Sequence, residues 1–476
     1  MQLIDKTSGF LGKPAKRLMA NAGNTIFRQL KKDFALKGKR IVVVCGSGNN
    51  GGDGLEAVRL LLEKGNSAKA VLVNGKPKTK AADEVYRKLV KKFPGSVGGK
   101  FSDIEEADLI IDAVFGTGFS GSIKGKYKET ITKMNKAKGK KVSIDIPSGF
   151  DCSRKDNKFF VKADVVYYLH AIKKGSERFS KKKILGIGIP KEAENIVLPS
   201  QIKFGKRKPT SHKRDNGVIT IVAGSSTYPG AAMLTANAAR AAFRTGTDLV
   251  IAACPKKVAW LLNLKQPEII SRKLKGNYLS KEHEKEILEL MNKSDCAVIG
   301  PGITRNKRTT ETVRELVKKS KGKIVLDADA IRAVKGMKFN DKVLLTPHAT
   351  EFENCFGRKL PNNYSKKLKL VKETARKHNC VILLKGALDI ISDGKKAVFN
   401  ATGNSGMTSG GTGDVLAGLC GAFAAENTLY DAACYAAFVN GYAGDNLFKE
   451  KAYGLIASDL IDELPVVIRK LTKGIK

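Results

Sequence analysis

The stretch from Asn400 to Gly418 reads NATGNSGMTSGGTGDVLAG, a glycine-rich loop followed by the start of an apolar helix. Asp414 stands where the apolar run of residues 415–417 begins. Glycines before a helix allow backbone N–H groups to converge, and the helix dipole adds partial positive charge there. The pattern predicts a phosphate site beside a carboxylate able to take a proton from an attacking hydroxyl. A glycine-rich turn in which Asp414 only caps the helix stays open as the alternative.

Short apolar strands alternate with helices along the chain before this stretch. The alternation favours a parallel sheet covered by helices on both faces. An Asp-Gly pair at 393–394 separates the last two strands and predicts a hairpin that leads into the loop. Strands are expected at residues 217–222, 248–253, 296–299, 323–326, 342–345, 381–384, 389–391 and 397–400.

The N-terminal part of the chain shows the same alternation. Helices are expected up to about residue 38 and at 81–91 and 125–136, with another that ends at Glu63. Strands are expected at 41–45, 68–73, 109–111, 141–144 and 164–168, before a lysine-rich tail. The polar stretch 198–214 contains Pro and Gly and predicts a linker. We therefore expect an α/β protein of two domains, residues 1–200, a Rossmann-like three-layer sandwich, and residues 210–476.

Composition narrows the class of protein. A chain of 476 residues is too long for one ordinary core, and 42% apolar with 28% charged residues is typical of a globular protein. The first residues carry an acid and no sustained apolar segment, so we expect no secretory signal and no membrane span. The eight cysteines form no CxxC pair, which favours reduced, buried thiols and a cytoplasmic protein.

The formal net charge of +40 raises the question of a nucleic-acid partner. The lysines are spread over nearly every expected helix, however, and no aromatic RNA-binding signature is present. A compositional bias, or a general attraction for anionic ligands, explains the charge equally well. We do not expect specific nucleic-acid binding.

The segment 46–54 reads GSGNNGGDG and satisfies the dinucleotide-binding pattern GxGxxG. The second strand, however, ends in Val73 and Asn74, so it lacks the acidic residue that would hold a ribose hydroxyl. Asn49, Asn50 and Asp53 crowd the turn instead. Asparagine tolerates unusual backbone angles and offers an amide oxygen, which suits a polar ligand or a cation.

Polar residues also follow two other strands of the N-terminal domain. Asp112 leads into AVFGTGFSG, and Asp145 leads into IPSG, which contains Ser148. Ligands bind beyond the carboxyl ends of parallel strands, so Asn50, Asp112, Asp145 and Ser148 are expected to converge. Each of them taken alone is better explained as a turn or cap residue.

Taken in order, GNNGGDG, DAVFGTGFSG and DIPSG resemble the YjeF amino-terminal NAD(P)H-hydrate epimerase family over residues 1–195. The resemblance implies that Asn50, Asp112 and Ser148 hold a potassium ion, whose preference for oxygen ligands fits these side chains. It implies that Asp145 contacts substrate and acts as the acid/base. The substrate-binding residues it implies are Asn49, Asn50, Gly51, Gly52, Asp53, Gly116, Thr117, Gly118, Phe119, Ser120, Gly121, Ser122 and Asp145.

The opening stretch, with six further motifs between 205 and 475, resembles the carbohydrate-kinase-like dehydratase family, which has the ribokinase-like fold. The motifs are SHKRDNGVITIVAGS, YPGAAMLTANAARAAFRTGTDLV, GPGI, DADA, LTPHATE and LKGALDII. The resemblance implies that Ala232, Gly302, His348 and Asp414 contact the substrate. The nucleotide-binding residues it implies are Lys385, Gly386, Ala387, Leu388, Asp389, Gly411, Thr412 and Gly413. His348 is otherwise read as a structural histidine, Lys385 as a solvated strand end, and Asp327 and Asp329 as caps of the next helix.

These two resemblances imply a bifunctional enzyme of nicotinamide-nucleotide repair. Its substrates would be the R and S forms of hydrated NADH or NADPH, and ADP, or ATP in some relatives, would donate the phosphoryl group. Asp414 would accept the proton of the ring hydroxyl, and elimination of the phosphate would restore the double bond. Mg²⁺ is expected because phosphoryl transfer commonly needs it, and a homo-oligomer is expected from the related dehydratases.

Two other functions remain to be weighed. A vitamin-precursor kinase of the ribokinase superfamily would release a stable phosphorylated product, but the epimerase-like domain and TPHATE argue against it. YjeF-like domains also occur in RNA-decapping scaffolds, which would suit the basic charge. The presence of Asn50, Asp112, Asp145 and Ser148 favours an enzyme.

Overall fold

The chain forms two compact units, Met1–Lys191 and Glu192–Lys476. The computed structural model describes residues 1–98, 102–119, 121–154, 156–205, 207–226 and 231–473, without the side chains of 231–236 and 473. The division precedes the expected linker at 198–214, because the Val197 N–H donates to the Phe399 carbonyl (2.9 Å) and so attaches this segment to the second unit. The expected α/β class is confirmed in both units.

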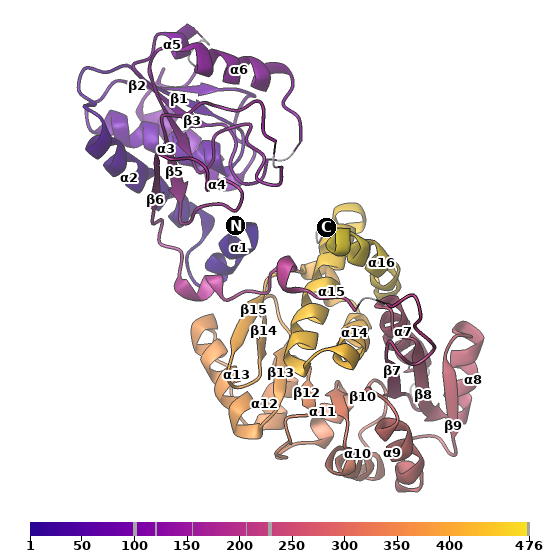
Figure 1. Cartoon of the computed structure of the whole chain (residues 1–476). Coiled ribbons are helices and arrows are strands. Elements are labelled where there is room, and N and C mark those ends of the chain that lie inside the picture. The colour runs from indigo at the N-terminus through magenta and orange to yellow at the C-terminus, as the bar shows by residue number, and fades with distance from the viewer. Residues whose placement is uncertain (99–101, 120, 155, 206, 227–230, 474–476) are drawn as a thin grey trace. The chain divides into compact units, whose positions relative to one another are not determined.

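The first unit contains a six-stranded parallel sheet in the order β2-β1-β3-β4-β5-β6 (Figure 1). Its strands are β1 (Ile41–Cys45), β2 (Ala68–Leu72), β3 (Leu109–Ala113), β4 (Lys140–Ile144), β5 (Val165–Leu169) and β6 (Lys182–Leu185). Strands β2 and β3 lie on opposite sides of β1, so the chain reverses direction across the sheet after β2. A crevice forms at such a reversal of strand order, beyond the carboxyl ends of β1 and β3.

Alternate residues of β1 face two different apolar cores. Val43 packs with Ile26 and Leu55 on one face, whereas Val44 packs with Ile131 on the other. Successive strand residues point to opposite faces, so a strand buried on both sides is continuously apolar. The first face is covered by α2 (Ala15–Asp33), α3 (Asn49–Glu63) and α4 (Lys80–Lys92), and the second by α5 (Ser102–Glu105) and α6 (Gly125–Lys136).

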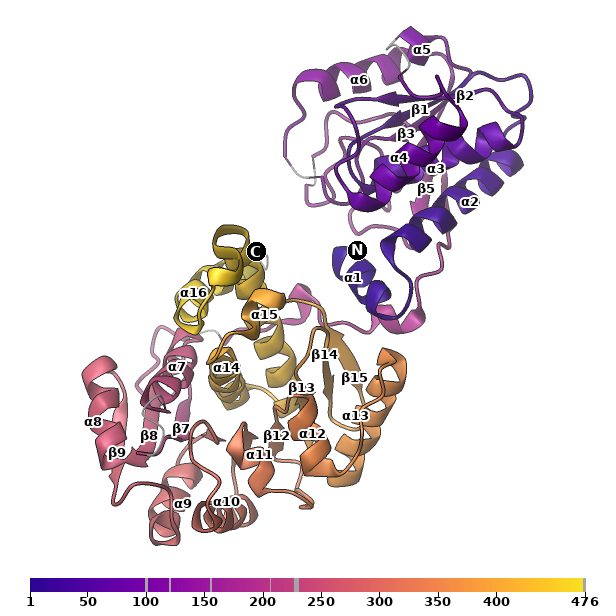
Figure 2. The same ribbon diagram turned by 180° about the vertical axis from the view of Figure 1, so that it is seen from behind.

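The second unit contains a nine-stranded sheet in the order β15-β14-β13-β12-β11-β10-β7-β8-β9 (Figure 2). All strand pairs are parallel except β13–β14 and β14–β15, and β14–β15 is the expected hairpin. The strands are β7 (Val218–Val222), β8 (Leu249–Pro255), β9 (Ile270–Leu274), β10 (Cys296–Ile299), β11 (Lys323–Leu326), β12 (Val343–Leu345), β13 (Val381–Leu384), β14 (Asp389–Ser392) and β15 (Ala397–Asn400).

Helix α14 (Thr412–Glu426) crosses the centre of this sheet. A Cβ atom at Gly421 would lie 2.4 Å from Val298 of β10, and one at Gly418 would lie 2.0 Å from the Ala238 carbonyl of α7. The remaining helices are α7 (Ala231–Arg244), α8 (Lys256–Lys265), α9 (Glu284–Asn292), α10 (Lys307–Lys319), α11 (Asp329–Ala333), α12 (Ala349–Phe356), α13 (Tyr364–His378), α15 (Leu429–Lys451) and α16 (Ala457–Lys473). α9 lies on the opposite face, where the Thr220 hydroxyl meets Ser294 after α9.

Three features differ from the expectations. The lysine-rich segment after β5 was expected to be a tail, which is wrong, because it contains β6. Edge strand β9 was not predicted. Helix α3 begins at Asn49, so most of the glycine-rich segment forms the first turns of a helix and not a loop. The segment up to residue 38 is helical as expected, and it consists of two helices, α1 (Gln2–Phe10) and α2.

All eight cysteines are free thiols, and all but Cys152 are buried. Burial raises the pKa of Cys254 to about 12, so this thiol is protonated at neutral pH. Within the described residues, no helix is both long enough and apolar enough to span a bilayer.

Candidate functional sites

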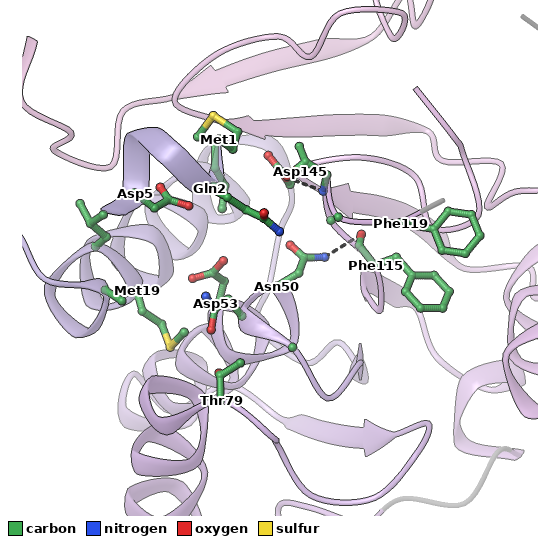
Figure 3. A pocket seen from close by; sticks show the side chains of 18 of the residues that line it. Met1, Gln2, Asp5, Met19, Asn50, Asp53, Thr79, Phe115, Phe119 and Asp145 are labelled. Atoms are coloured by element: carbon green, nitrogen blue, oxygen red, sulfur yellow. Dashed lines mark hydrogen bonds between the residues drawn. The ribbon is translucent and has the colours of Figure 1, made fainter. Parts of the chain in front are cut away.

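A cavity of about 560 Å³ lies beyond the carboxyl ends of β1, β3 and β4 in the first unit (Figure 3). Its wall combines the start of α3, the loop after β3, and residues of α1. Its lining includes eight of the residues for which the resemblance implied substrate binding: Asn49, Asn50, Asp53, Gly116, Thr117, Gly118, Phe119 and Asp145. Met1 and, from α1, Gln2 and Asp5 also line it, and they were not predicted because this segment carries no motif.

Asn50 joins the wall of this cavity to the ends of two strands. Its side-chain amide donates to the Phe115 carbonyl (2.9 Å) and to the Ile144 carbonyl (3.4 Å). The α3 turn approaches β3 closely because Gly46 has no side chain: a Cβ atom there would lie 2.0 Å from the Val114 carbonyl. Asn50 is thereby fixed between the loops that follow β3 and β4.

Asp145 combines an unusual backbone with an ion pair. Its φ angle is 67°, a left-handed conformation that costs free energy for a residue other than glycine and is often found at functional sites. Oδ1 lies 2.8 Å from the Lys173 ammonium, and Oδ2 accepts the Thr117 N–H (3.3 Å). Both charged side chains are buried, 12% and 7% exposed. Lys173 lies in the lysine-rich segment, to which the sequence assigned no role.

Asp112 lies behind the cavity wall and is fully buried. Its carboxylate accepts hydrogen bonds from Ser143 Oγ and from the backbone and hydroxyl of Ser148. Ser148 Oγ in turn accepts the Phe115 N–H (2.8 Å), which connects this pair to the partner of Asn50. Burial raises the pKa of Asp112, although these hydrogen bonds oppose the shift. Asn50, Ser148 and Asp112 are therefore connected through Phe115, and Asp145 lies next to Asn50, since a Cβ atom at Gly116 would be 3.2 Å from Asp145 Oδ2 and 3.4 Å from Asn50 Cβ.

The donor set around Asp112 fits a weakly held monovalent cation. The hydrogen-bond partners of this buried carboxylate are neutral serine groups and a backbone N–H, so they do not balance its charge. The nearby oxygens belong to Asn50, Ser148 and main-chain carbonyls, which suit K⁺ better than a transition metal. No cluster of three or more His, Cys, Asp or Glu side chains able to hold a metal occurs among the described residues.

Several expected substrate residues lie away from the cavity lining. Gly51 and Gly52 are buried, and Gly52 packs against Met19 and Ala82. Gly121 donates to Asp151 Oδ2 (3.2 Å), and neither it nor Ser122 lines the cavity. Ser120 lies outside the described residues.

Asp53 adds a second titratable group to the cavity. Burial raises the pKa of Asp53 well above its usual value, and the nearby carboxylates of Asp145 and Asp5 raise it further. Burial also raises the pKa of Asp5. Asp53 therefore holds a proton more readily than an exposed aspartate, beside Asp145, which has a cationic partner.

In the second unit, Asp414 lies in the first turn of α14 and is 8% exposed. Gly411 precedes the helix with φ 90°, a conformation that glycine adopts without strain, and no side chain caps the helix. Burial and the nearby Asp327 carboxylate raise the pKa of Asp414 to about 7, while Lys385 opposes the shift. An uncapped helix N-terminus with a carboxylate poised near neutrality suits proton transfer beside a phosphoryl group.

Lys385 lies at the same helix terminus. Its ammonium lies 2.7 Å from Asp327 Oδ1, and a Cβ atom at Gly413 would be 3.5 Å from it. Asp327 also accepts the Thr346 hydroxyl (2.7 Å). Burial alone would lower the pKa of Lys385, but the Asp327 carboxylate raises it, which keeps the side chain charged. Lys385 is therefore not the solvated strand end of the alternative reading, and Asp327 is not a helix cap.

The other expected residues of this unit have varied surroundings. Gly386 and Ala387 are exposed, Leu388 is buried, and the Gly386 N–H donates to Asp389 Oδ1 (2.9 Å). Thr412 donates its hydroxyl to the Met407 carbonyl (2.8 Å). Exposed His348 caps α12, and half-buried Gly302 has φ 68°. Ala232 is placed in α7, but its side chain lies outside the described residues.

Comparison with known proteins assigns a separate family to each part. A family model described as "YjeF-related protein N-terminus" matches residues 15–175, and one described as "NAD(P)H-hydrate dehydratase" matches residues 219–466.

Full-length relatives carry both parts. Proteins from Pyrobaculum aerophilum and Archaeoglobus fulgidus, each named bifunctional NAD(P)H-hydrate repair enzyme, are both 36% identical to this chain. The alignments cover 99% and 98% of the chain and 97% of each relative. The Bacillus subtilis ADP/ATP-dependent NAD(P)H-hydrate dehydratase, co-crystallised with ATP and Mg²⁺, superposes with a TM-score of 0.50 and 26% identity. The superposition covers 58% of this chain and 98% of the Bacillus subtilis protein.

Proposed function

Because the chain belongs to the family of bifunctional NAD(P)H-hydrate repair enzymes, we propose that its two sites divide the repair reaction between them. The enzyme epimerises the R and S forms of hydrated NADH or NADPH and dehydrates the S form with a nucleotide donor. The cavity of the first unit performs the epimerisation, and the α14 terminus performs the dehydration. The observation that carries the second assignment is Asp414, buried at an uncapped helix terminus beside the Lys385 ammonium.

In dehydration, Asp414 accepts the proton of the ring hydroxyl as that oxygen attacks the terminal phosphoryl group of ADP. The backbone N–H groups around residues 411–413 and the Lys385 ammonium stabilise the negative charge on the transferring phosphoryl group. AMP leaves, and the substrate now carries a phosphate ester in place of a hydroxyl. Loss of that phosphate, with a proton from the adjacent ring carbon, restores the double bond. ADP as the donor in preference to ATP, and Mg²⁺, belong to this proposal.

In epimerisation, Asp145 exchanges a proton with the hydrated ring. Lys173 and the Thr117 N–H hold its carboxylate in one orientation at the cavity wall. Asp53 is the second acid of the pair: its raised pKa favours the protonated form, which can donate a proton to the ring. Asn50, Asp112 and Ser148 would hold K⁺, which supplies a positive charge that balances Asp112 and fixes the loop after β3.

The overall assignment is tested by incubating the protein with hydrated NADH and ADP. The dihydronicotinamide absorbance should return, and AMP and phosphate should accumulate in equal amounts. Phosphorylation of a vitamin precursor without recovery of NADH would instead support the kinase reading. RNA binding with a steep salt dependence, and no turnover of either epimer, would support a scaffold. Location in the cytoplasm and assembly into a homo-oligomer remain predictions. Light scattering would measure the oligomeric state.

The rate of dehydration should depend on the protonation of Asp414. Below the pKa of about 7, kcat should fall about tenfold per pH unit, because only the carboxylate can accept the hydroxyl proton. Above it, kcat should level off. The measurement is kcat at saturating ADP and substrate across neutral pH, with substrate stability checked at each pH. A flat profile across this range would exclude Asp414 as the base of a rate-limiting chemical step.

Potassium should stabilise the first unit through Asp112. Ions that bind only the folded state raise the unfolding temperature, so KCl should raise Tm relative to tetramethylammonium chloride. Asp112→Asn should abolish that difference and lower the epimerisation rate about tenfold or more. Ser143→Ala is a matched control, since it removes a hydrogen bond to Asp112 but no expected ligand. An equal potassium effect on Tm in Asp112→Asn would contradict the site.

A further inference from the structure

Asp327 has no role in the proposed reaction, yet it is the residue that connects the charged groups at the α14 terminus. It follows β11, is 2% exposed, and lies 2.7 Å from the Lys385 ammonium. The Thr346 hydroxyl after β12 donates to the same oxygen, Oδ1 (2.7 Å). A buried carboxylate costs free energy unless it is paired and hydrogen-bonded, and Asp327 is both.

The position of Lys385 depends on this pairing. A lysine side chain has several rotatable bonds, so its ammonium needs a partner to remain in one place. Asp327 supplies that partner on the side away from solvent, and the ammonium is thereby held against Gly413 in the first turn of α14. Without the ion pair, the ammonium would be free to leave the helix terminus for solvent.

We propose that Asp327 is a positioning residue of the phosphoryl-transfer centre, which holds Lys385 at the α14 terminus and sets the charge that Asp414 faces. This inference rests on the proposed dehydration. Asp327 does not touch the reacting atoms, and it acts through Lys385 and through its negative charge. The arrangement makes three groups interdependent: a cation, its buried partner, and the base.

The electrostatics of the centre support this role. Two charged groups face Asp414, and they act in opposite directions: Asp327 raises its pKa and Lys385 lowers it. Glu351 of α12 also faces Lys385 and helps to keep it charged. Removal of Asp327 alone would leave an unbalanced cation beside Asp414, whereas removal of Lys385 alone would leave two carboxylates facing each other. The two changes should therefore move the pH profile in opposite directions.

The test compares Asp327→Asn with Lys385→Met in the full-length enzyme, by kcat, KM for ADP and the pH dependence of kcat for dehydration. Asp327→Asn should lower kcat about tenfold to hundredfold, since a misplaced group costs that much, and should move the midpoint of the pH profile to lower pH. Lys385→Met should move the midpoint to higher pH. Measurement of Tm for each variant separates these effects from loss of folding.

Asp329→Asn is the matched control, because this carboxylate lies two residues further along and pairs with the largely exposed Arg305 (2.8 Å). It should leave kcat and the profile unchanged. An unshifted midpoint in folded Asp327→Asn would overturn the proposal. If that variant does not fold, an unshifted midpoint in Lys385→Met overturns it equally. Failure of the unmodified enzyme to dehydrate the substrate would instead overturn the proposed function, so the two failures are distinguishable.

Discussion

Asp414→Asn should lower the dehydration rate about 10²- to 10⁴-fold, the range expected for loss of a general base. The asparagine has the same shape but cannot accept the hydroxyl proton. Burial of Asp414 raises its pKa to about 7, so the carboxylate is both a stronger base than an exposed aspartate and largely ionised just above neutrality. The measurement is the recovery of NADH absorbance from the pure S form with ADP, compared at equal enzyme concentration.

The same variant carries its own control, because epimerisation takes place in the other unit. The rate at which R and S forms interconvert should be unchanged within experimental error. Asp414→Asn should also fold normally, because the removal of a charge from a buried position relieves a desolvation cost. KM for ADP should change little if Asp414 acts only on the hydroxyl. Retained dehydration in a folded variant would show that another group is the base.

The fold could be predicted from the sequence wherever the strands are buried. β1, β10, β11 and β13 have the predicted bounds, because an interior strand covered on both faces is a nearly uninterrupted apolar run, and the bounds of edge strand β15 follow from the hairpin turn before it. The edge strands β6 and β9 read KKIL and ISRKL and were missed. Charged residues on edge strands protect an exposed backbone from pairing with other chains, and the same residues remove the apolar pattern.

The glycines of residues 46–54 show a different limit. Their number suggested a loop, but the structure has a helix from Asn49, because glycine there serves close packing and not only turning. A Cβ atom at Gly54 would lie 2.6 Å from Ala113 of β3. Sequence shows that a residue is small but not what lies against it. Only the packed structure reveals which glycines meet a neighbouring strand.

The candidate sites were predictable where they follow strand ends, and not where they depend on distant charges. Asp145 and Asp414 stand out because each begins or follows a recognisable motif. Lys173 lies in no motif, and Asp327, although it begins the DADA motif, was interpreted as a possible helix cap, since each acquires its role from a partner far along the chain. A lysine in a lysine-rich segment carries no signal of burial. The pairing of Lys173 with Asp145 appears only when β5 and β4 lie side by side.

Asp145→Asn should lower the epimerisation rate about 10²- to 10⁴-fold while the dehydration of pure S substrate continues unchanged. Asparagine is the appropriate substitution because it tolerates the left-handed backbone that Asp145 adopts, φ 67°. Loss of activity would therefore reflect the loss of the carboxylate and not a change of backbone. The measurement is the interconversion of R and S forms followed by chromatography, without ADP.

Lys173→Met separates the chemical role of Asp145 from its orientation. The Lys173 ammonium lies 2.8 Å from Asp145 Oδ1 in a buried ion pair. Because removal of the ammonium leaves the buried carboxylate without a partner, we expect Lys173→Met to have a lower Tm and slower epimerisation. An unchanged epimerisation rate in a folded Lys173→Met protein would contradict a role of the ion pair in orienting Asp145. An Asp145→Asn protein that still epimerises would transfer the acid/base role to Asp53 or Asp5, the other two carboxyl groups that line the cavity, because a proton acceptor at the ring is required in either case.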